Sequence, residues 1–142
     1  MKILVASDGS KHALHAVRYA VKLVRQLSSL SNSITLVSVH DDAGLHHARS
    51  LMGSDAVAEY LRDFSEKELK PATKLLDAAG IKHDMEQRIG HVAQEIVACA
   101  KKGKYDLIML GAKGRGVIMD ALIGSVAQRV LATSDTPVLL VK

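Results

Sequence analysis

The sequence predicts a doubly wound α/β domain, with a mainly parallel five-stranded sheet and helices on both faces. Short apolar or β-branched runs alternate with amphipathic stretches of helical spacing along the chain. The runs Lys2–Ala6 and Leu107–Leu110 are almost entirely apolar, as expected for parallel strands covered on both faces. The length of 142 residues suits one domain, so we expect a single domain over residues 1–142.

The expected strands and helices follow one another in regular order. The strands are Lys2–Ala6, Ile34–Val39, Ile81–Ile89, Leu107–Leu110 and Val138–Val141. The helices, which have apolar residues three and four positions apart, are expected between residues 13 and 27, 57 and 79, 91 and 103, and 125 and 131. The third strand alternates imperfectly, and we expect it to be more exposed than the others.

Start and stop residues define the ends of these elements. The expected caps and stops are Ser10 at the first helix, Gly80 at the second and Gly103 at the third. Pro71 lies inside the second helical pattern, where it is expected to kink or split the helix near Leu69. The segment Ser28–Ser33 is predicted as a polar connection, and His40–Gly53 as a polar loop, with a short helical turn in it as the alternative.

Composition excludes several classes of protein. Aromatic residues make up only 3% of the chain, which disfavours a stacking platform for single-stranded nucleic acid, and the net charge of +4 is spread along the sequence. The single cysteine, Cys99, cannot form an internal disulfide. The apolar run in the N-terminal MKILVAS is too short for a signal peptide, and no run approaches the roughly 20 apolar residues of a membrane span. We therefore expect a cytoplasmic protein that binds neither nucleic acid nor membranes.

The stretch from Asp106 to Leu131 carries the strongest functional signal. An apolar strand leads into a glycine-rich loop, and Gly124-Ser125 then opens a helix whose apolar positions are Val126, Val130 and Leu131. A helix N-terminus has amides without intrahelical partners and a positive dipole end, and glycines let an anion approach closely. The stretch is therefore predicted to hold the phosphates of a nucleotide.

Two common phosphate-binding motifs do not fit this stretch. A P-loop would need Lys-Ser at Val117-Ile118, after the glycines at 111 and 116. A dinucleotide fingerprint would follow the first strand and need a third glycine where Met119 stands. What remains is the spacing Gly111-x2-Gly114-x9-Gly124-Ser125, and a simpler interpretation is that these glycines only form turns.

At these residues the sequence resembles the ATP-binding branch of the universal stress protein family, which carries Gly-x2-Gly-x9-Gly-[Ser/Thr] between its fourth strand and last helix. The resemblance covers essentially the whole chain. ILVASDGS resembles the family's first strand and acidic turn, and Val39-His40 the end of its second strand; GSVAQRVL and TPVLLVK resemble its last helix and closing strand. The resemblance implies a Rossmann-like fold of the adenine nucleotide alpha hydrolase type.

The resemblance also implies a set of nucleotide-binding positions. Asp8 and its two preceding residues would meet the adenosine moiety, and the backbone at Val39 the adenine. The residues at the end of the fourth strand would line the ribose and triphosphate path, and those opening the last helix would hold phosphates by amides and hydroxyl. The full set is Ala6, Ser7, Asp8, Val39, Leu110, Gly111, Lys113, Gly114, Arg115, Gly124, Ser125, Val126 and Ala127.

Three positions in or beside this set differ from the usual family pattern. Ala127 stands where the family often has Ser or Thr, so one hydroxyl contact with phosphate is expected to be missing. Ala112-Lys113 replaces a more usual polar pair. Lys113 and Arg115 are predicted to supply mobile positive charge near the phosphates.

Other groups of reactive side chains allow weaker hypotheses. Asp8 has an alternative interpretation as a turn carboxylate that accepts hydrogen bonds from nearby amides. His12 and His15 share a helix face, and the histidines and aspartates between His40 and His47 are a conceivable metal-binding loop without visible ligand geometry. Cys99 on an apolar helix face is expected in the core, with a redox role as the alternative. We identify no catalytic triad and no residue placed to activate water against a γ-phosphate.

The leading hypothesis is therefore an ATP-binding regulatory protein of the universal stress type, without dedicated catalysis. Its expected cofactor is ATP with Mg²⁺ or Mn²⁺ carried by the phosphates, and a protein partner is conceivable. By resemblance, a homodimer would form through the last strand, at Val138, Leu139, Leu140 and Val141. The alternatives are a slow ATPase or nucleotide-dependent transferase, and a ligand-free dimerisation module.

Overall fold

The computed structural model describes residues 1–27, 31–43, 45–115 and 122–142, and in these ranges five strands form one sheet in which every neighbouring pair is parallel. The strand order is β3-β2-β1-β4-β5. The strands are β1 (Lys2–Ala6), β2 (Ser33–His40), β3 (His83–Ile89), β4 (Leu107–Gly111) and β5 (Val138–Val141). The predicted doubly wound fold class is confirmed, with a sheet that is parallel throughout the described strands.

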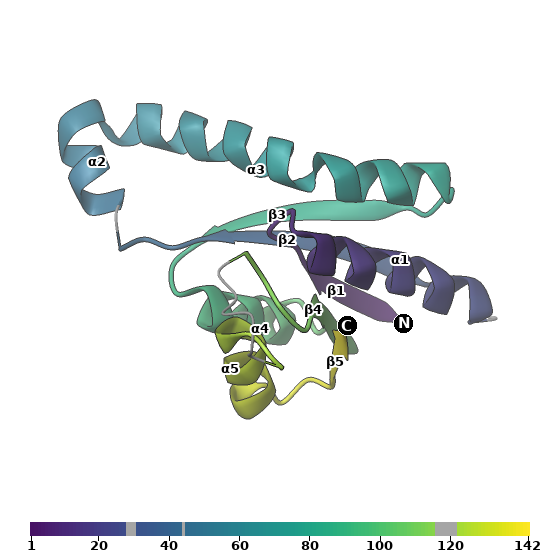
Figure 1. Cartoon of the computed structure of the whole chain (residues 1–142). Coiled ribbons are helices and arrows are strands. Elements are labelled where there is room, and N and C mark those ends of the chain that lie inside the picture. Colours follow the sequence, from purple (N-terminus) through teal and green to yellow (C-terminus); the bar gives the residue numbers. More distant parts are fainter. Residues whose placement is uncertain (28–30, 44, 116–121) are drawn as a thin grey trace.

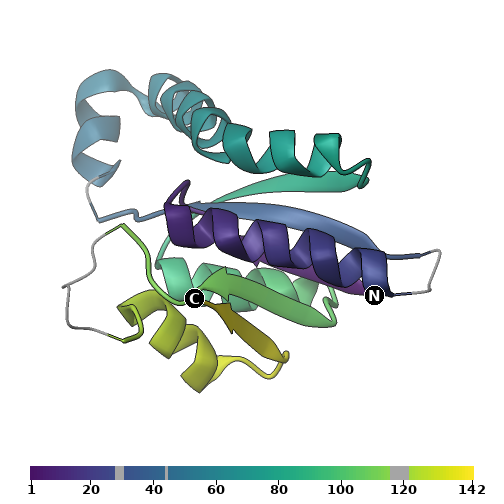
Figure 2. The ribbon, with the colours of Figure 1, turned by 45° about the vertical axis from the view of Figure 1, so that its right-hand side comes forward.

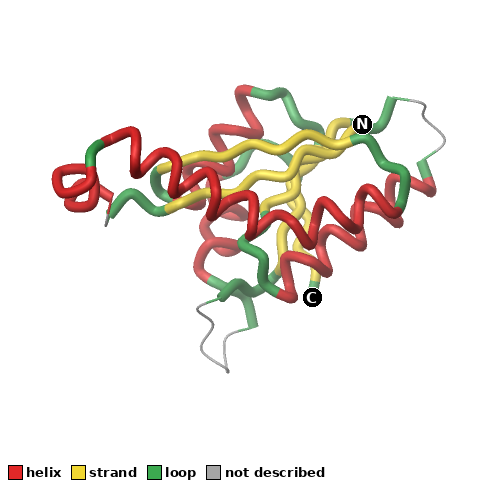
Figure 3. Tube along the Cα trace, turned by 90° about the horizontal axis from the view of Figure 1, so that it is seen from above, coloured by secondary structure: helices red, strands yellow, loops and turns green. Residues whose placement is uncertain are grey.

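Helices cover both faces of the sheet (Figures 1 and 2). One layer contains α1 and α3, and the opposite layer contains α4 and α5; α2 lies beyond the end of the sheet, as Figure 3 shows from above. The helices are α1 (Lys11–Gln26), α2 (Leu45–Met52), α3 (Ser54–Ala78), α4 (Val92–Lys102) and α5 (Ser125–Thr133). Within the described segments, no helix is both long enough and apolar enough to cross a membrane.

Alternate residues of the central strand supply the two halves of the core. Ile3 and Val5 of β1 pack under α1 and α3, and Leu4 between them packs under α4 and α5. All three side chains are fully buried. Because successive strand residues point to opposite faces, an apolar run is what a strand covered on both sides requires.

Several expected helix ends are confirmed. The Ser10 hydroxyl accepts a hydrogen bond from the Ala13 amide at 3.2 Å and caps α1. Gly80 follows α3 with a φ of +68°, a conformation that glycine adopts without strain and that ends a helix. Gly103 is the C-cap of α4. The chemistry of these caps is local, which is why the sequence pattern was sufficient to predict them.

Two local expectations differ from the structure. The segment predicted as a polar loop contains the eight-residue helix α2, none of whose residues is buried and which rests against α3. Pro71 does not split the second helix, because α3 runs continuously from Ser54 to Ala78, and the kink expected there stays a prediction. The ring of Pro71 is on the exposed side, whereas Leu69 and Ala72 on either side of it are buried against the sheet. Packing therefore holds the helix together across the proline.

Three apolar residues that have helical spacing with their neighbours are exposed. Tyr60 and Phe64 of α3 are 60% and 37% exposed, and Leu131 of α5 is 45% exposed. The buried positions of α5 are Ala127 and Val130. Gly116 and the positions at 117–119 used to reject two motifs lie outside the described residues, as do 28–30 of the first polar connection.

The strand order determines where a binding site can form. From β1 the chain first builds β2 and β3 on one side, and then crosses to build β4 and β5 on the other. In doubly wound sheets, ligands bind outside the carboxyl ends of the strands at this reversal. The ends of β1 and β4, at Ala6 and Gly111, meet at that point.

Candidate functional site

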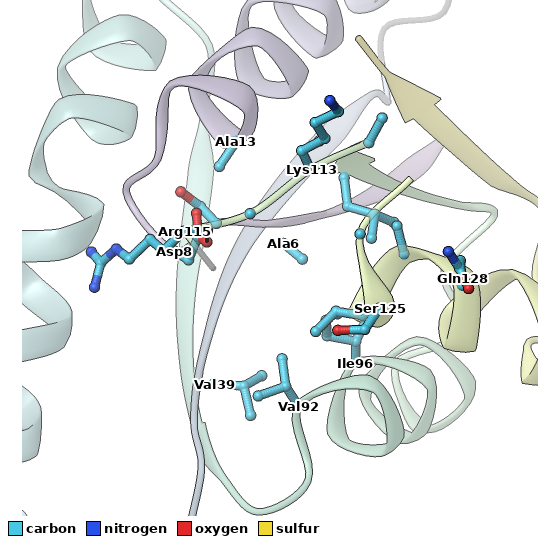
Figure 4. Close-up of a pocket in the computed structure, with 18 of the residues that line it drawn as sticks. Ala6, Asp8, Ala13, Val39, Val92, Ile96, Lys113, Arg115, Ser125 and Gln128 are labelled. Atoms are coloured by element: carbon cyan, nitrogen blue, oxygen red, sulfur yellow. Dashed lines mark hydrogen bonds between the residues drawn. The ribbon is translucent and has the colours of Figure 1, made fainter. Parts of the chain in front are cut away.

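A cavity of about 430 Å³ lies at the carboxyl ends of β1, β2 and β4, beside the start of α5 (Figure 4). All thirteen residues predicted to bind nucleotide line it, although they come from four separate parts of the sequence. The cavity has the size of typical small-molecule sites, about 300–1,000 Å³. The binding role of each residue stays a prediction.

Seven lining residues were missed by sequence reasoning: Ala13, Val37, Val92, Ile96, Ala112, Ile123 and Gln128. Val92 and Ile96 occupy the first two turns of α4 and form an apolar wall near Val39, as Figure 4 shows. Their spacing of four residues is a signal of one apolar helix face, but it does not show that the face borders a cavity. This wall is suited to the flat face of an aromatic base.

The end of β2 presents backbone groups toward the cavity. The Ser7 amide donates to the Val37 carbonyl at 3.0 Å, so the backbone groups of Val37 point toward β1. Alternate strand residues point the same way, so the N–H and C=O of Val39 face the same side. The strand β1 ends at Ala6, which pairs with Val37, so Val39 lies beyond it. A donor and an acceptor side by side can recognise one edge of a base.

The N-terminus of α5 presents backbone amides that precede its first intrahelical hydrogen bond. The Gln128 amide donates to the Gly124 carbonyl at 3.0 Å, so the amides of Ser125, Val126 and Ala127 precede the first intrahelical hydrogen bond of α5. Gly124 is the N-cap and has no side chain with which to satisfy them. The Ser125 hydroxyl borders the same cavity. Oriented amides and the positive helix end favour phosphate here.

The three motif glycines are present for different physical reasons. A Cβ on Gly111 would lie 2.6 Å from the carbonyl carbon of His12, so Gly111 allows α1 to pack closely on β4. A Cβ on Gly114 would lie 3.1 Å from the Asp8 carboxylate. A Cβ on Gly124 would meet nothing closer than 3.5 Å. Only Gly124 therefore has room on its Cβ side that a ligand could use.

Asp8 connects the first turn with the glycine loop. Its Oδ1 accepts from the Ser10 amide at 2.9 Å, as the turn-carboxylate interpretation predicts, and its Oδ2 accepts from the Arg115 amide at 3.2 Å. Each carboxylate oxygen can accept more than one hydrogen bond. Asp8 therefore holds the loop in place and keeps acceptor capacity for the hydroxyls of a sugar.

The two basic side chains of the loop do not point at the start of α5. Arg115 pairs with Glu68 of α3, with 2.8 Å between Nη2 and Oε1, and its guanidinium extends away from the cavity in Figure 4. The Lys113 side chain points away from Ser125 in the same view. The predicted positive charge near the phosphates is therefore directed elsewhere in this structure, because a buried carboxylate on α3 engages the arginine.

Some of the histidines and aspartates considered as metal ligands have other partners in the described part of the chain. Within the ranges that the structure describes, no three His, Cys, Asp or Glu side chains gather as metal ligands. His40 instead lies 2.6 Å from the Ser65 hydroxyl through its Nε2, and the rings of His12 and His15 meet edge to face.

Cys99 is in the core, as expected. Its Sγ donates to Glu86 Oε2 at 3.3 Å, and only 1% of the residue is exposed. Burial, followed by the hydrogen bond to Glu86, raises the pKa of the thiol from 9.0 to about 11. The pKa of Glu86 is lowered instead. Burial alone would raise this pKa, but hydrogen bonds from Arg88 and Cys99 outweigh the effect of burial. Cys99 is therefore a protonated, unreactive thiol near neutral pH, which disfavours a redox role.

The raised pKa of Cys99 predicts a loss of stability in alkali. The native thiol keeps its proton to a higher pH than the thiol of the unfolded chain. Its contribution to the free energy of unfolding is therefore present below about pH 9 and is lost as the pH rises through about 11. A difference of two pKa units corresponds to about 2 to 3 kcal/mol. The gap in unfolding free energy between wild type and Cys99→Ala should shrink by about that amount from pH 8 to pH 11, as measured by urea denaturation. An equal gap at both pH values would contradict a raised pKa of Cys99 in the native protein.

Fold and site together define the class of protein: a doubly wound α/β domain whose cavity, at the reversal of strand order, joins a helix N-terminus to an apolar wall. Comparison with known proteins identifies the family. The model of the universal stress protein family matches residues 1–142, and the chain belongs to that family.

Individual relatives agree with this assignment. The chain is 33% identical over 141 residues to universal stress protein MJ0531 of Methanocaldococcus jannaschii, covering 99% of this chain and 81% of that protein. It superposes on the structure of hypothetical protein MJ0577 of the same organism with a TM-score of 0.80 and 27% identity, covering 99% and 94% of the two chains. A universal stress protein in complex with cAMP superposes with a TM-score of 0.73 at 24% identity, over 100% and 97% of the chains.

Proposed function

We propose that this protein binds an adenine nucleotide, with ATP as its ligand and Mg²⁺ or Mn²⁺ carried by the phosphates, and that it acts as a nucleotide-dependent regulator in the stress response. The observation that supports this most strongly is one cavity that joins uncapped helix amides to an apolar wall and the open backbone at Val39. A related universal stress protein has been solved with cAMP, which supports a nucleotide as the class of ligand.

The proposed arrangement assigns each part of the nucleotide to a wall of the cavity. The base lies against Val92 and Ile96 with its edge at the Val39 backbone, and the ribose hydroxyls meet Asp8. The phosphates extend along the glycine loop toward the amides and hydroxyl at the start of α5. In this arrangement Asp8 meets the ribose, and the phosphates would carry the metal ion and supply its oxygen ligands.

The residues that line the cavity favour a regulatory function over a catalytic one. Among the described residues that line the cavity, Asp8 is the one carboxylate, and it is engaged by two amides rather than free to accept a proton from water. In this proposal the protein is a sensor, and its conformation depends on whether nucleotide is bound.

We further propose a homodimer that pairs the β5 edges of two copies. The strand β5 is the last in the sheet order, and its residues Val138–Val141 are only partly buried. An apolar edge strand offers unpaired backbone groups to another chain, and a second copy would cover it. One nucleotide-binding domain per copy and a location in the cytoplasm stay predictions.

Titration calorimetry with ATP and with adenosine tests the proposed function. We expect wild-type protein to bind ATP in the micromolar range, about 8 kcal/mol, with lower affinity for adenosine. Asp8→Ala should weaken both ligands about tenfold, because a hydroxyl contact to a charged acceptor is lost.

The comparison of the two ligands separates the possible roles of Asp8. A loss confined to ATP would show that Asp8 only positions the glycine loop, through the Arg115 amide. Unchanged affinity for both would remove Asp8 from the site. No heat and no thermal shift with ATP in wild type would refute the proposed function itself.

A further inference from the structure

A buried carboxylate on α3 engages the arginine of the glycine loop. Glu68 Oε1 lies 2.8 Å from Arg115 Nη2, and the Glu68 side chain is only 6% exposed whereas that of Arg115 is 53% exposed. The other oxygen, Oε2, accepts from the Ser38 hydroxyl at 2.6 Å, and Ser38 is fully buried near the end of β2. Both oxygens of Glu68 therefore have partners, and the carboxylate is held in one place.

The backbone of Arg115 contacts the wall of the cavity, whereas its side chain contacts α3. Its amide donates to Asp8 in the wall of the cavity, and the residue lines the cavity. Its guanidinium pairs with Glu68, which does not line the cavity, and the Arg115 side chain points away from Ser125 in Figure 4. Gly9 lies beneath the pair, since a Cβ there would be 3.1 Å from both Arg115 Nη2 and Glu68 Cγ. The ion pair thus forms next to the proposed phosphate path, not within it.

Phosphate and Glu68 would compete for the same guanidinium. Arginine binds phosphate oxygens with paired, charge-assisted hydrogen bonds, and a half-exposed side chain can reorient at little cost. The carboxylate is in the opposite situation, because a buried charge that loses its partner is strongly disfavoured. Glu68 therefore opposes transfer of Arg115 to a phosphate, and the opposition matters more the further the phosphate chain extends toward the loop.

The same exchange would alter the outer surface of α3. The Arg115 guanidinium lies 5.9 Å from the centre of the Phe64 ring, and Phe64 stacks with Tyr60 at 6.3 Å. Departure of Arg115 would uncover one side of an aromatic pair that is already partly exposed. The occupancy of the phosphate path is thereby linked to a surface outside the cavity.

We propose that Glu68 is a positioning residue that withholds Arg115 from the terminal phosphate and so limits how strongly the site prefers nucleotides with a long phosphate chain. The inference rests on the proposed function and adds a residue and a form of regulation to that site. Binding of the γ-phosphate moves Arg115 away from Glu68, and the loss of this contact exposes Phe64 on α3.

Calorimetry with AMP and ATP on four proteins tests this inference: wild type, Glu68→Gln, Arg115→Gln and the double variant. Glu68→Gln keeps the shape and an acceptor for Ser38 but removes the competing charge. It should tighten ATP about tenfold and leave AMP within about twofold. Arg115→Gln should weaken ATP about tenfold with little effect on AMP, and adding Glu68→Gln to it should bring no gain in ATP affinity.

The ratio of ATP to AMP affinity is the decisive readout, because damage to the fold would affect both ligands. Equal losses for AMP and ATP in Glu68→Gln, no change in either, or a gain in ATP affinity that persists without Arg115 would each overturn the inference while leaving the proposed function standing. Wild-type protein that binds neither nucleotide would refute the proposed function and this inference with it.

Discussion

Gly124→Val is expected to abolish ATP binding and leave the protein folded. The φ of Gly124 is −71°, which any residue can adopt, and a Cβ there would contact only the glycine loop at 3.5 Å or more. The two methyl groups of valine extend beyond that Cβ into the gap between the loop and the first amides of α5. Phosphate needs the same space, so we expect a loss of about 100-fold or more in affinity.

Gly124→Ala is the matched control for this experiment. Its Cβ fits at ordinary contact distance, so it should lower ATP affinity by no more than about tenfold and keep the melting temperature within a few degrees of wild type. Calorimetry with ATP gives the affinities, and circular dichroism with heating verifies the fold. Equal ATP affinity in wild type and the valine variant would show that phosphate is not held at this end of α5.

Gly111→Ala is expected to have the opposite signature, a large loss of stability. The added Cβ would lie 2.6 to 2.8 Å from the carbonyl carbon, carbonyl oxygen and Cβ of His12. Two of these atoms are backbone, so α1 as a whole must move away from β4. Overpacking of this kind costs about 3 kcal/mol. The effect would spread, because α1 belongs to the same core cluster as residues of β4 and β5.

Urea denaturation of Gly111→Ala beside Gly124→Ala measures this effect with the same chemical change at both sites. We expect a clear drop in unfolding free energy for the first variant and almost none for the second. Unfolding curves that coincide would show that Gly111 is not required for the packing of α1 on β4. The two variants would thus separate a packing role of Gly111 from the proposed binding role of Gly124.

The sequence was most informative where the physics is local. Ser10 could be identified as a cap because its hydroxyl bonds an amide three residues away, and Gly80 as a stop because a left-handed residue is needed there. The buried strand Lys2–Ala6 was recognisable because both faces of a central parallel strand must be apolar. From such elements the doubly wound order, and a site at its strand ends, could be predicted.

Local rules failed where packing between elements overrides them. Pro71 does disfavour a helix interior, but Leu69 and Ala72 are buried against the sheet and keep α3 continuous. Tyr60 and Phe64 have the spacing of a buried face, yet the part of α3 that carries them lies toward α2, near the end of the sheet (Figure 3). Helical spacing indicates which side chains share a face, but not whether another element covers that face.

The fold class, the family resemblance and the candidate phosphate-binding end of α5 could all be predicted from residue patterns, because each pattern lies within a continuous stretch of the chain. The rest of the site depends on contacts between elements. Val92 and Ile96 reach the cavity because α4 packs against β2, and Glu68 reaches Arg115 because α3 packs against α1 and β2. Such neighbours lie tens of residues apart in the chain, and no local pattern records contacts that form only when the layers of the domain pack together.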